Sequence, residues 1–329
     1  MKQMQRVFVT GGAGYVGSAL VPDLLMRGYE VTVYDLFIYG EDVIDSHPNL
    51  KLVKGDIRDL KRLITEIPDH DAIIHLACIS NDPSFELNPE LGRAINLDPF
   101  RPLVEISRDS GVSKFIYASS SSVYGVKDVE NVTENMSLEP LTDYSKFKVQ
   151  CEEILLEYET DTFTTAIVRP ATVCGYARRQ RLDVVVNILS NLAFHNREIT
   201  IFGGDQLRPN INILDMVRVY VEFLEAPREL IGGQIFNAGY ENHSVSELGE
   251  MVVDVFGTDV SMIKIETDDK RSYHVSSSKM KEVLGFETKY TIKDAIKSLK
   301  KAFQEQLLDE PMSNEMYVNI KRMKSINLS

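Results

Sequence analysis

Residues 6–17 read Arg-Val-Phe-Val-Thr-Gly-Gly-Ala-Gly-Tyr-Val-Gly, a β-branched run followed directly by a glycine-rich turn. The run predicts a buried strand, and the glycines at 11, 14 and 17 form a G-x-x-G-x-x-G motif that opens a helix. Glycine at the turn lets the backbone approach a pyrophosphate, and the helix N-terminus supplies free N–H groups and a positive dipole. Gly17 allows the helix to lie close to the strand. The stretch therefore predicts a dinucleotide-binding unit.

An acidic residue completes this unit. Asp35 ends the second predicted strand, 18 residues after Gly17, where its carboxylate can accept the adenosine ribose hydroxyls and repel a 2′-phosphate. Residues 36–39 contain no basic side chain, which favours NAD over NADP. A structural turn with a capping Asp is the alternative. The predicted cofactor contacts here are Gly11, Gly14, Tyr15, Val16, Gly17, Asp35 and Leu36.

Two later strand ends add weaker signals. Asp56-Ile57 follows the third strand, and Asp56 is a candidate contact to the adenine. Leu76 and Ala77 follow the fourth strand and could form the floor beneath the adenine, with plain core burial as the alternative. His75 reads as a core histidine rather than a catalyst.

The first 170 residues alternate apolar strand-like runs with helical periodicity, which predicts a Rossmann-type α/β fold with a doubly wound parallel sheet. The rhythm breaks after Arg169-Pro170. We expect an NAD-binding domain over residues 1–170 and a smaller, mixed α/β substrate lobe over 171–329, with segments interleaved. Its tail from Glu310 is polar with scattered apolar residues, and the pattern leaves open whether it is a strap or a frayed end. The predicted strands are Arg6–Thr10, Glu30–Asp35, Lys51–Lys54, Ala72–Leu76, Phe115–Ser119 and Phe163–Val168; the predicted helices are Tyr15–Arg27, Leu60–Ile67, Pro89–Ser110 and Tyr144–Tyr158.

Composition narrows the function classes. Lys and Arg total 36 against 49 Asp and Glu, a formal net charge of −13. Such acidity disfavours nucleic acid and anionic lipid as partners. No apolar run is long enough to span a membrane, and from the first residues we expect no signal peptide. Cys78, Cys151 and Cys174 fit neither a disulfide framework nor a zinc site. We expect a cytoplasmic protein without a metal.

A second motif carries chemistry. Tyr144 and Lys148 are four residues apart and share a helix face. A free tyrosine has a pKa of about 10, but a nearby ammonium and an oxidised nicotinamide both favour the phenolate. Lys148 can also hold the nicotinamide ribose. Upstream, Ser119–Ser122 follows the fifth strand at its carboxyl end, where a serine can share the proton of a reacting hydroxyl.

With these motifs the chain resembles an extended short-chain dehydrogenase/reductase of the NAD-dependent nucleotide-sugar epimerase/dehydratase family. The resemblance covers residues 5 to about 305. It implies oxidation of a nucleotide-linked sugar by tightly held NAD, with Tyr144 as base, Lys148 as orienting residue and Ser120 as hydroxyl partner. Ser121 and Ser122 stand where 4,6-dehydratases have Asp-Glu, so dehydration is not expected. The segments in family order are Thr10–Gly17, His75–Ala77, Ser119–Gly125, Tyr144-x-x-x-Lys148 and Arg169-Pro170, and Pro170 joins the cofactor contacts.

The resemblance also suggests how the substrate is held. Arg208 and Arg271 match positions where the family uses Arg for the diphosphate, and guanidinium groups suit phosphate oxygens. Arg178, Arg179 and Arg181 are further candidates, with solvated surface charge as the alternative for the first two. Thr172 stands where the family often has a diphosphate-binding Asn, and the loop at Tyr176–Asp183 suggests a branch acting on GDP-linked sugars and heptoses. The expected substrate contacts are Ser80, Asn81, Ser121, Ser122, Thr172, Arg181, Asn187, Arg208 and Arg271.

Three functions remain open. The first is a nucleotide-sugar 4-epimerase, which oxidises C4 and returns the hydride to the opposite face. The second is a C4 dehydrogenase, for example of a GDP-linked sugar, that releases the keto sugar. The third is a non-catalytic NAD-binding sensor, which has no need for an intact Ser120, Tyr144 and Lys148.

Apolar residues on two helices predict a partner. The resemblance implies a homodimer through a four-helix bundle, and intrachain burial is the alternative. The residues concerned are Leu97, Phe100, Leu103, Val104, Phe147, Val149, Ile154 and Leu155.

Overall fold

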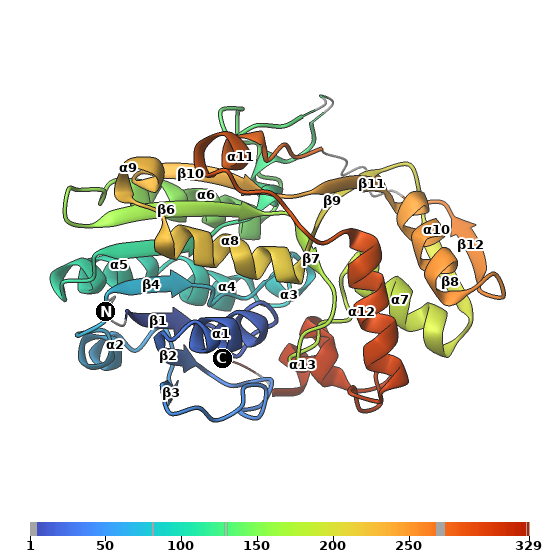
Figure 1. The fold of residues 1–329 in the computed structure, drawn as a ribbon, viewed down its shortest axis with the longest axis horizontal. Helices are drawn as coiled ribbons and strands as arrows, with labels where there is room; N and C mark the ends of the chain where they lie inside the picture. The colour runs from blue at the N-terminus through green and yellow to red at the C-terminus, as the bar shows by residue number, and fades with distance from the viewer. Residues whose placement is uncertain are drawn as a thin grey trace.

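A parallel sheet forms the centre of the protein (Figure 1). The computed structural model describes residues 5–80, 82–127, 129, 131–267, 274–326 and 328. Among these, seven strands pair in the order β10-β6-β5-β4-β1-β2-β3, with every neighbouring pair parallel. The order reverses between β1 and β4, and ligands bind at such a point in open α/β sheets. The strands are β1 (Arg6–Thr10), β2 (Glu30–Asp35), β3 (Leu50–Lys54), β4 (Ala72–His75), β5 (Lys114–Ala118), β6 (Thr164–Pro170) and β10 (Gln234–Ala238).

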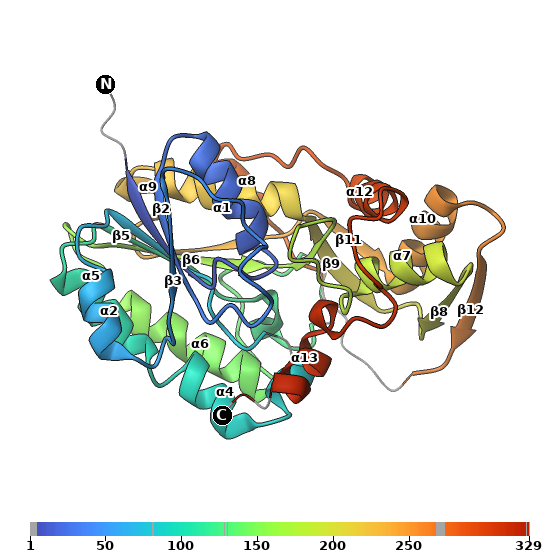
Figure 2. The same ribbon diagram turned by 90° about the horizontal axis from the view of Figure 1, so that it is seen from below.

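Helices cover both faces of this sheet, which confirms the predicted doubly wound Rossmann fold (Figure 2). The inner strands are buried because they are packed from both sides: β1 reads exposed only at Arg6, and all of β4 is buried. One face carries α1 (Gly17–Met26), α8 (Ile213–Glu225) and α9 (Arg228–Ile231), and α11 (Ser278–Leu284) lies beside β10. The other face carries α2 (Leu60–Glu66), α4 (Pro89–Asn96), α5 (Phe100–Asp109) and α6 (Asp143–Leu156).

One predicted helix is wrong in its extent. Residues 89–110 form two helices, α4 and α5, separated at 97–99, rather than one. Pro99 has no N–H to donate, and a proline disfavours helical backbone at the residue before it, so the chain turns here. Asn96 is the last residue of α4 before this break. Its side-chain amide accepts from the Ile79 N–H at 2.8 Å and donates to the Ile79 carbonyl at 3.0 Å. It thereby braces the loop that follows β4.

The chain after β6 builds a second, smaller part. A three-stranded sheet has the order β11-β9-β7, and β8 pairs in parallel with β12. Three helices, α7, α10 and α12, enclose a separate apolar core here. The chain returns to the main sheet through α8 and β10, so the two parts are interleaved. These elements are β7 (Thr172–Cys174), α7 (Val185–His195), β8 (Glu198–Phe202), β9 (Leu207–Asn212), β11 (Glu241–Ser244), α10 (Val245–Phe256), β12 (Ser261–Ile265) and α12 (Ile292–Gln304).

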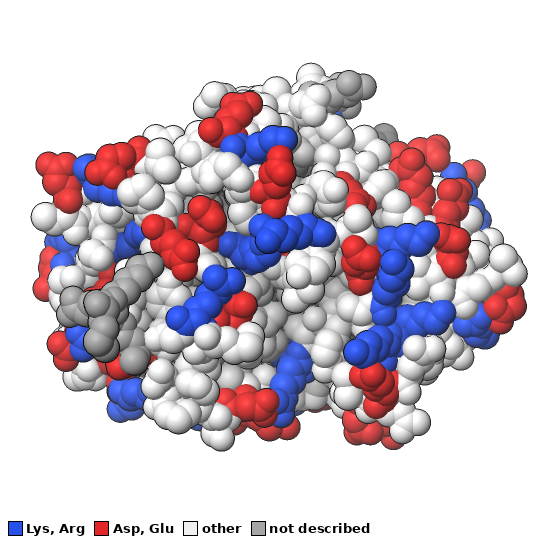
Figure 3. All heavy atoms as spheres, viewed as in Figure 1, with Lys and Arg blue, Asp and Glu red and all other residues white. Residues whose placement is uncertain are grey.

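The surface carries both signs of charge. Figure 3 shows acidic and basic side chains interspersed over the face seen in Figure 1. Within the described part of the chain, no helix is long and apolar enough to cross a membrane. The described residues likewise contain no group of three His, Cys, Asp or Glu that could hold a metal ion.

The apolar stripes on α5 and α6 are mostly accounted for within one chain. Phe100, Leu103, Val104 and Leu155 are buried in the core beneath the sheet. Leu97, Phe147, Val149 and Ile154 are half-buried and pack against neighbouring core clusters. A surplus of apolar residues therefore no longer carries the argument for a dimer, which stays a prediction.

Candidate active site

A cavity of about 460 Å³ opens at the carboxyl ends of β1 and β4. Gly11 has φ +72°, and a Cβ added to it would lie 2.6 Å from the Ala77 backbone nitrogen. A Cβ on Gly17 would lie 2.4 Å from the Gly12 carbonyl oxygen. Both positions require glycine, and the turn exposes the start of α1 to the cavity, where a pyrophosphate is favoured. The cavity is lined by the whole predicted cofactor set: Gly11, Gly14, Tyr15, Val16, Gly17, Asp35, Leu36, Asp56, Ile57, Leu76, Ala77, Tyr144, Lys148 and Pro170.

Asp35 marks the end of the cavity suited to an adenosine. Its carboxylate accepts from the backbone N–H of Ala13 at 3.0 Å and of Phe37 at 2.8 Å. Burial raises the pKa of Asp35, and these bonds and the charge of Arg179 oppose the rise. The Arg179 guanidinium lies 3.5 Å from the centre of the Tyr39 ring. Residues 36–39 contain no basic side chain, and the basic group near Asp35 comes instead from Arg179 in the second half of the chain.

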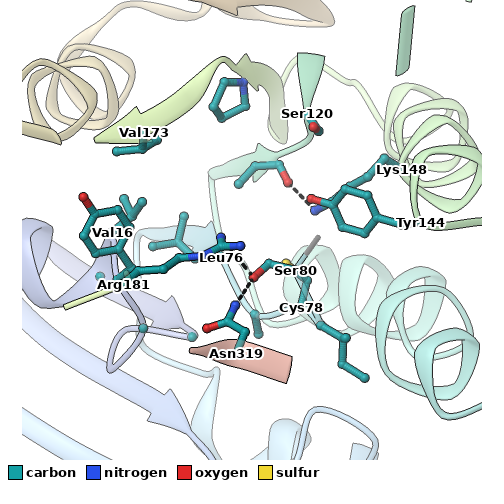
Figure 4. A pocket seen from close by; sticks show the side chains of 18 of the residues that line it. Val16, Leu76, Cys78, Ser80, Ser120, Tyr144, Lys148, Val173, Arg181 and Asn319 are labelled. Atoms are coloured by element: carbon teal, nitrogen blue, oxygen red, sulfur yellow. Dashed lines mark hydrogen bonds between the residues drawn. The ribbon is translucent and has the colours of Figure 1, made fainter. Parts of the chain in front are cut away.

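Ser120, Tyr144 and Lys148 meet at the other end (Figure 4). Tyr144 and Lys148 lie on one face of α6, and Ser120 precedes the 3₁₀ turn η1 (Ser121–Tyr124). The Lys148 ammonium is 5.7 Å from the Tyr144 ring centre and donates to the Ala118 carbonyl at 2.7 Å.

The Tyr–Lys spacing predicts a lowered pKa for Tyr144, but in the structure its pKa is raised. Burial raises the pKa, and Cys78 and Asp82 raise it further, whereas Arg181 and a hydrogen bond with Ser120 lower it. The surrounding protein therefore keeps the phenol protonated. A positive charge brought by the oxidised nicotinamide would oppose this.

A chain of hydroxyl groups leads from Ser120 to a carboxylate. The Oγ atoms of Ser120 and Ser122 are 2.9 Å apart, and Ser122 is 2.9 Å from Ser145 Oγ. Ser145 is 3.0 Å from the Thr142 hydroxyl, which donates to Asp82 at 2.6 Å. Thr142 also caps α6, and Asp82 begins α3 (Asp82–Phe85). The hydroxyl orientation at Ser120 is thus linked to a charged group on another element.

Buried polar contacts fix the ends of β5 and β6. The Arg169 guanidinium pairs with the Glu152 carboxylate at 2.9 and 2.6 Å and donates to the Tyr124 hydroxyl at 2.8 Å. Ser119 donates to the same carboxylate. His75 is buried, bonded to the Thr10 hydroxyl, and burial lowers its pKa to about 3, so it is neutral. Of these groups only Ser119 lines the cavity, and the others support it from behind.

Arg181 reaches the cavity from the loop after β7. It is bound by Asp183 at 2.6 Å and points toward Ser80, 3.5 Å from its hydroxyl (Figure 4). Arg208 lines the cavity from β9, the middle strand of the second sheet. The predicted substrate residues that line the cavity are Ser80, Ser121, Ser122, Thr172, Arg181 and Arg208.

The structure does not place the other three predicted substrate residues in the cavity. Asn187 is fully buried and does not line the cavity; its amide accepts from the Gly175 N–H and donates to the Tyr15 hydroxyl and the Arg181 carbonyl. Its amide hydrogens are thus used in holding Tyr15 and the Arg181 loop. Asn81 and Arg271 lie outside the described residues.

The cavity also contains residues that sequence patterns missed. Helix α13 (Asn319–Ile326) supplies Asn319 and Met323, and neither belongs to a motif. Cys78 and Asp82 line it as well. Arg179, a candidate for the diphosphate in the sequence analysis, also lines the cavity, but it lies near Asp35 and Tyr39.

The glycine turn on a reversed parallel sheet and the Ser–Tyr–Lys group in the same cavity define a dinucleotide-dependent enzyme that acts on a hydroxyl. The model of the NAD dependent epimerase/dehydratase family matches residues 7–239. The chain belongs to this family, and its cofactor is NAD.

Known proteins agree with this assignment. UDP-glucose 4-epimerase of Corynebacterium glutamicum is 26% identical over 309 residues, which cover 87% of this chain and 92% of that protein. The uncharacterized protein y4nG of Sinorhizobium fredii is 34% identical over 202 residues, 61% of this chain but only 48% of that protein. The structure of UDP-glucuronic acid 4-epimerase from Bacillus cereus, in complex with UDP-glucuronic acid and NAD, superimposes with a TM-score of 0.81. It is 25% identical and covers 92% of this chain and 100% of its own. The protein is therefore an NAD-dependent enzyme of the nucleotide-sugar epimerase/dehydratase type.

Proposed function

We propose that this enzyme is a nucleotide-sugar 4-epimerase. The observation that supports this most is that Ser120, Tyr144 and Lys148 share one cavity with the NAD turn, while Ser121 and Ser122 replace the acids that a dehydratase would use. The names of the relatives above also favour a UDP-linked sugar as the first candidate.

The chemistry follows from these side chains. NAD supplies the hydride acceptor when bound. The Tyr144 oxygen takes the proton of the C4 hydroxyl, and Ser120 bonds the same oxygen and keeps it oriented. After the keto sugar rotates in the site, Tyr144 returns the proton to the oxygen on C4, which becomes the new hydroxyl. Lys148 holds the nicotinamide ribose and adds positive charge beside the phenolate.

We further propose that Arg181 and Arg208 bind the substrate diphosphate, together with Ser80 and Thr172, which line the same cavity. Arg271 stays a predicted contact outside the described residues. An acidic chain repels such an anion unless local guanidinium groups receive it. In this proposal, residues 1–170 mainly bind NAD and residues 171–329 mainly bind substrate.

The test is a panel of UDP- and GDP-linked sugars incubated with the enzyme, followed by absorbance of NADH and by NMR of the products. An isomeric sugar without net NADH indicates the epimerase. A keto sugar with accumulating NADH would indicate the C4 dehydrogenase instead, and no turnover with any member would contradict the proposal.

We also propose a cytoplasmic homodimer. The support is the family resemblance, and Phe147 and Ile154 on α6 and Leu97 between α4 and α5 are only half-buried, which leaves apolar surface for a second copy. Sedimentation at micromolar concentration checks this, and a stable monomer would contradict it.

A further inference from the structure

The C-terminal segment Glu315–Ile326 lies against the cofactor cavity rather than apart from it. Helix α13 contacts α3, and Figure 1 shows it below α3, near the junction of the two parts of the molecule. Figure 2 shows α13 beside α4. The segment begins with η2 (Glu315–Tyr317), whose Tyr317 carbonyl accepts from the Leu182 N–H at 2.8 Å. The family model matches residues 7–239, and this segment lies beyond that match.

Asn319 is the central contact. Its side chain is buried and donates to the Ser80 hydroxyl at 2.9 Å (Figure 4). The amide oxygen accepts from the Tyr39 hydroxyl at 3.1 Å and from the Arg179 guanidinium. Its backbone N–H donates to the Asp183 carboxylate at 3.0 Å. One residue of the tail therefore joins the β2 and β4 loops of the NAD half to the arginine loop of the substrate half.

The next turn of the helix adds two contacts. Met323 is buried, lines the cavity and belongs to the same apolar cluster as Tyr34 and Ile57. Arg322 donates to the Ile38 carbonyl at 2.6 Å. Both contacts fall at the end of the cavity marked by Asp35. The opposite face of the helix, with Lys321 and Lys324, is exposed.

We propose that α13 is a latch that holds NAD in the enzyme through the whole catalytic cycle. Met323 walls the adenosine end, and Asn319 positions Arg179 and Ser80 around the cofactor. This rests on the proposed function, because an epimerase must keep the reduced cofactor until the hydride is returned, whereas a dehydrogenase must exchange it. The anchoring of the latch to both parts of the molecule suits retention.

The test measures cofactor retention, not turnover. The Asn319→Ala/Met323→Ala variant is compared with wild type and with Lys321→Ala/Lys324→Ala, which changes only the exposed face of the same helix. NAD per chain is measured by chromatography after gel filtration and denaturation, and NADH dissociation by fluorescence. We expect the first variant to lose its NAD and to release NADH roughly ten- to a hundredfold faster, because buried polar partners are left unpaired. The control should match wild type.

Equal NAD content and equal dissociation rates in all three proteins would overturn the latch, as would equal losses in the control. Thermal unfolding and circular dichroism establish that each variant is folded. If the double variant does not fold, the single Asn319→Ala variant is measured in the same way. A failure of the proposed function has a different signature, since NAD-loaded wild type would then produce no isomeric sugar while its NADH dissociation could still depend on α13.

Discussion

The two halves of the molecule recognise their ligands by different means. The NAD side is built by one continuous β–turn–α unit, in which backbone atoms and two required glycines, Gly11 and Gly17, shape the site. The proposed substrate side is built from side chains on separate elements: Arg181 on a loop, Arg208 on β9 and Thr172 on β7. A site formed by the backbone of one continuous segment can be predicted from a sequence motif, whereas a site assembled from side chains far apart in the chain cannot.

The difference extends to how the halves are supported. In the NAD half, the proposed catalytic residues lie on α6 and directly after β5, and the buried Arg169–Glu152 pair joins β6 to α6. In the second half, Arg181 depends on Asp183 and on a loop held by Asn187. Substitutions on α6 and in the glycine turn should therefore alter chemistry and cofactor binding, and those at Arg181 and Arg208 should alter substrate affinity, whereas α13 belongs to the second half but is proposed to act on NAD.

The largest effect should come from Tyr144→Phe. The variant should retain NAD, since the shape of the site survives, but kcat should fall by roughly a hundred- to ten-thousandfold because the base is removed. Tyr158→Phe, at the far end of the same helical region and bonded to Glu105, is the control and should be close to wild type. More than about a tenth of the wild-type activity in Tyr144→Phe would assign the base elsewhere.

Lys148→Met should both slow turnover and weaken NAD binding, because one ammonium serves the phenolate and the ribose. We expect losses of roughly a hundredfold in kcat and about tenfold in NAD affinity. Calorimetry and steady-state kinetics measure the two. Lys146→Met removes an exposed lysine of the same helix and should do neither. Unchanged NAD affinity in Lys148→Met would show that Lys148 does not bind the nicotinamide ribose.

Much of the fold could be predicted because it is local. The strands β1 and β2 and the residues of the glycine turn follow from apolar runs and spacing. The division of residues 89–110 into two helices was missed although Pro99 was visible, because apolar periodicity continues across the break. Asn319 could not be predicted, since its contact to Ser80 joins residues far apart in the chain. Arg179 was a candidate for the diphosphate, but its place beside Tyr39 could not be predicted for the same reason.

Arg208→Ala tests the second half directly. KM for the nucleotide sugar should rise, with a loss of roughly ten- to a hundredfold in kcat/KM and little change in kcat at saturation. Arg208→Lys should recover part of the loss, because it keeps the charge but not the guanidinium fork. Arg178→Ala, an exposed arginine paired with Asp45, is the control. An unchanged KM in Arg208→Ala would show that Arg208 does not bind the diphosphate, and Arg181 would then be the next candidate.

A smaller effect is expected at Asp35. Asp35→Ala removes a charge that opposes a 2′-phosphate, so the preference for NAD over NADP should narrow by about tenfold. Titration of both cofactors into wild type and variant measures the ratio. The nearby Arg179 should then favour NADP, and Asp35→Ala/Arg179→Ala should lose that gain. A ratio equal to that of wild type would show that Asp35 serves only the turn through its bonds to Ala13 and Phe37.

The smallest effect concerns pH and the hydroxyl chain between Ser120 and Asp82. Asp82 raises the pKa of Tyr144, because a second negative charge nearby disfavours the phenolate. Activity that needs the phenolate is lost as pH falls through the Tyr144 pKa. Asp82→Asn should lower that pKa and move the acidic limb of kcat/KM to lower pH, by less than about one unit. Asp143→Asn, an exposed carboxylate in the first turn of α6, is the control and should leave the limb in place. An acidic limb that stays fixed or moves to higher pH in Asp82→Asn would show that the charge of Asp82 does not act on Tyr144, and would leave Cys78, Arg181 and the hydrogen bond with Ser120 as the influences on its pKa.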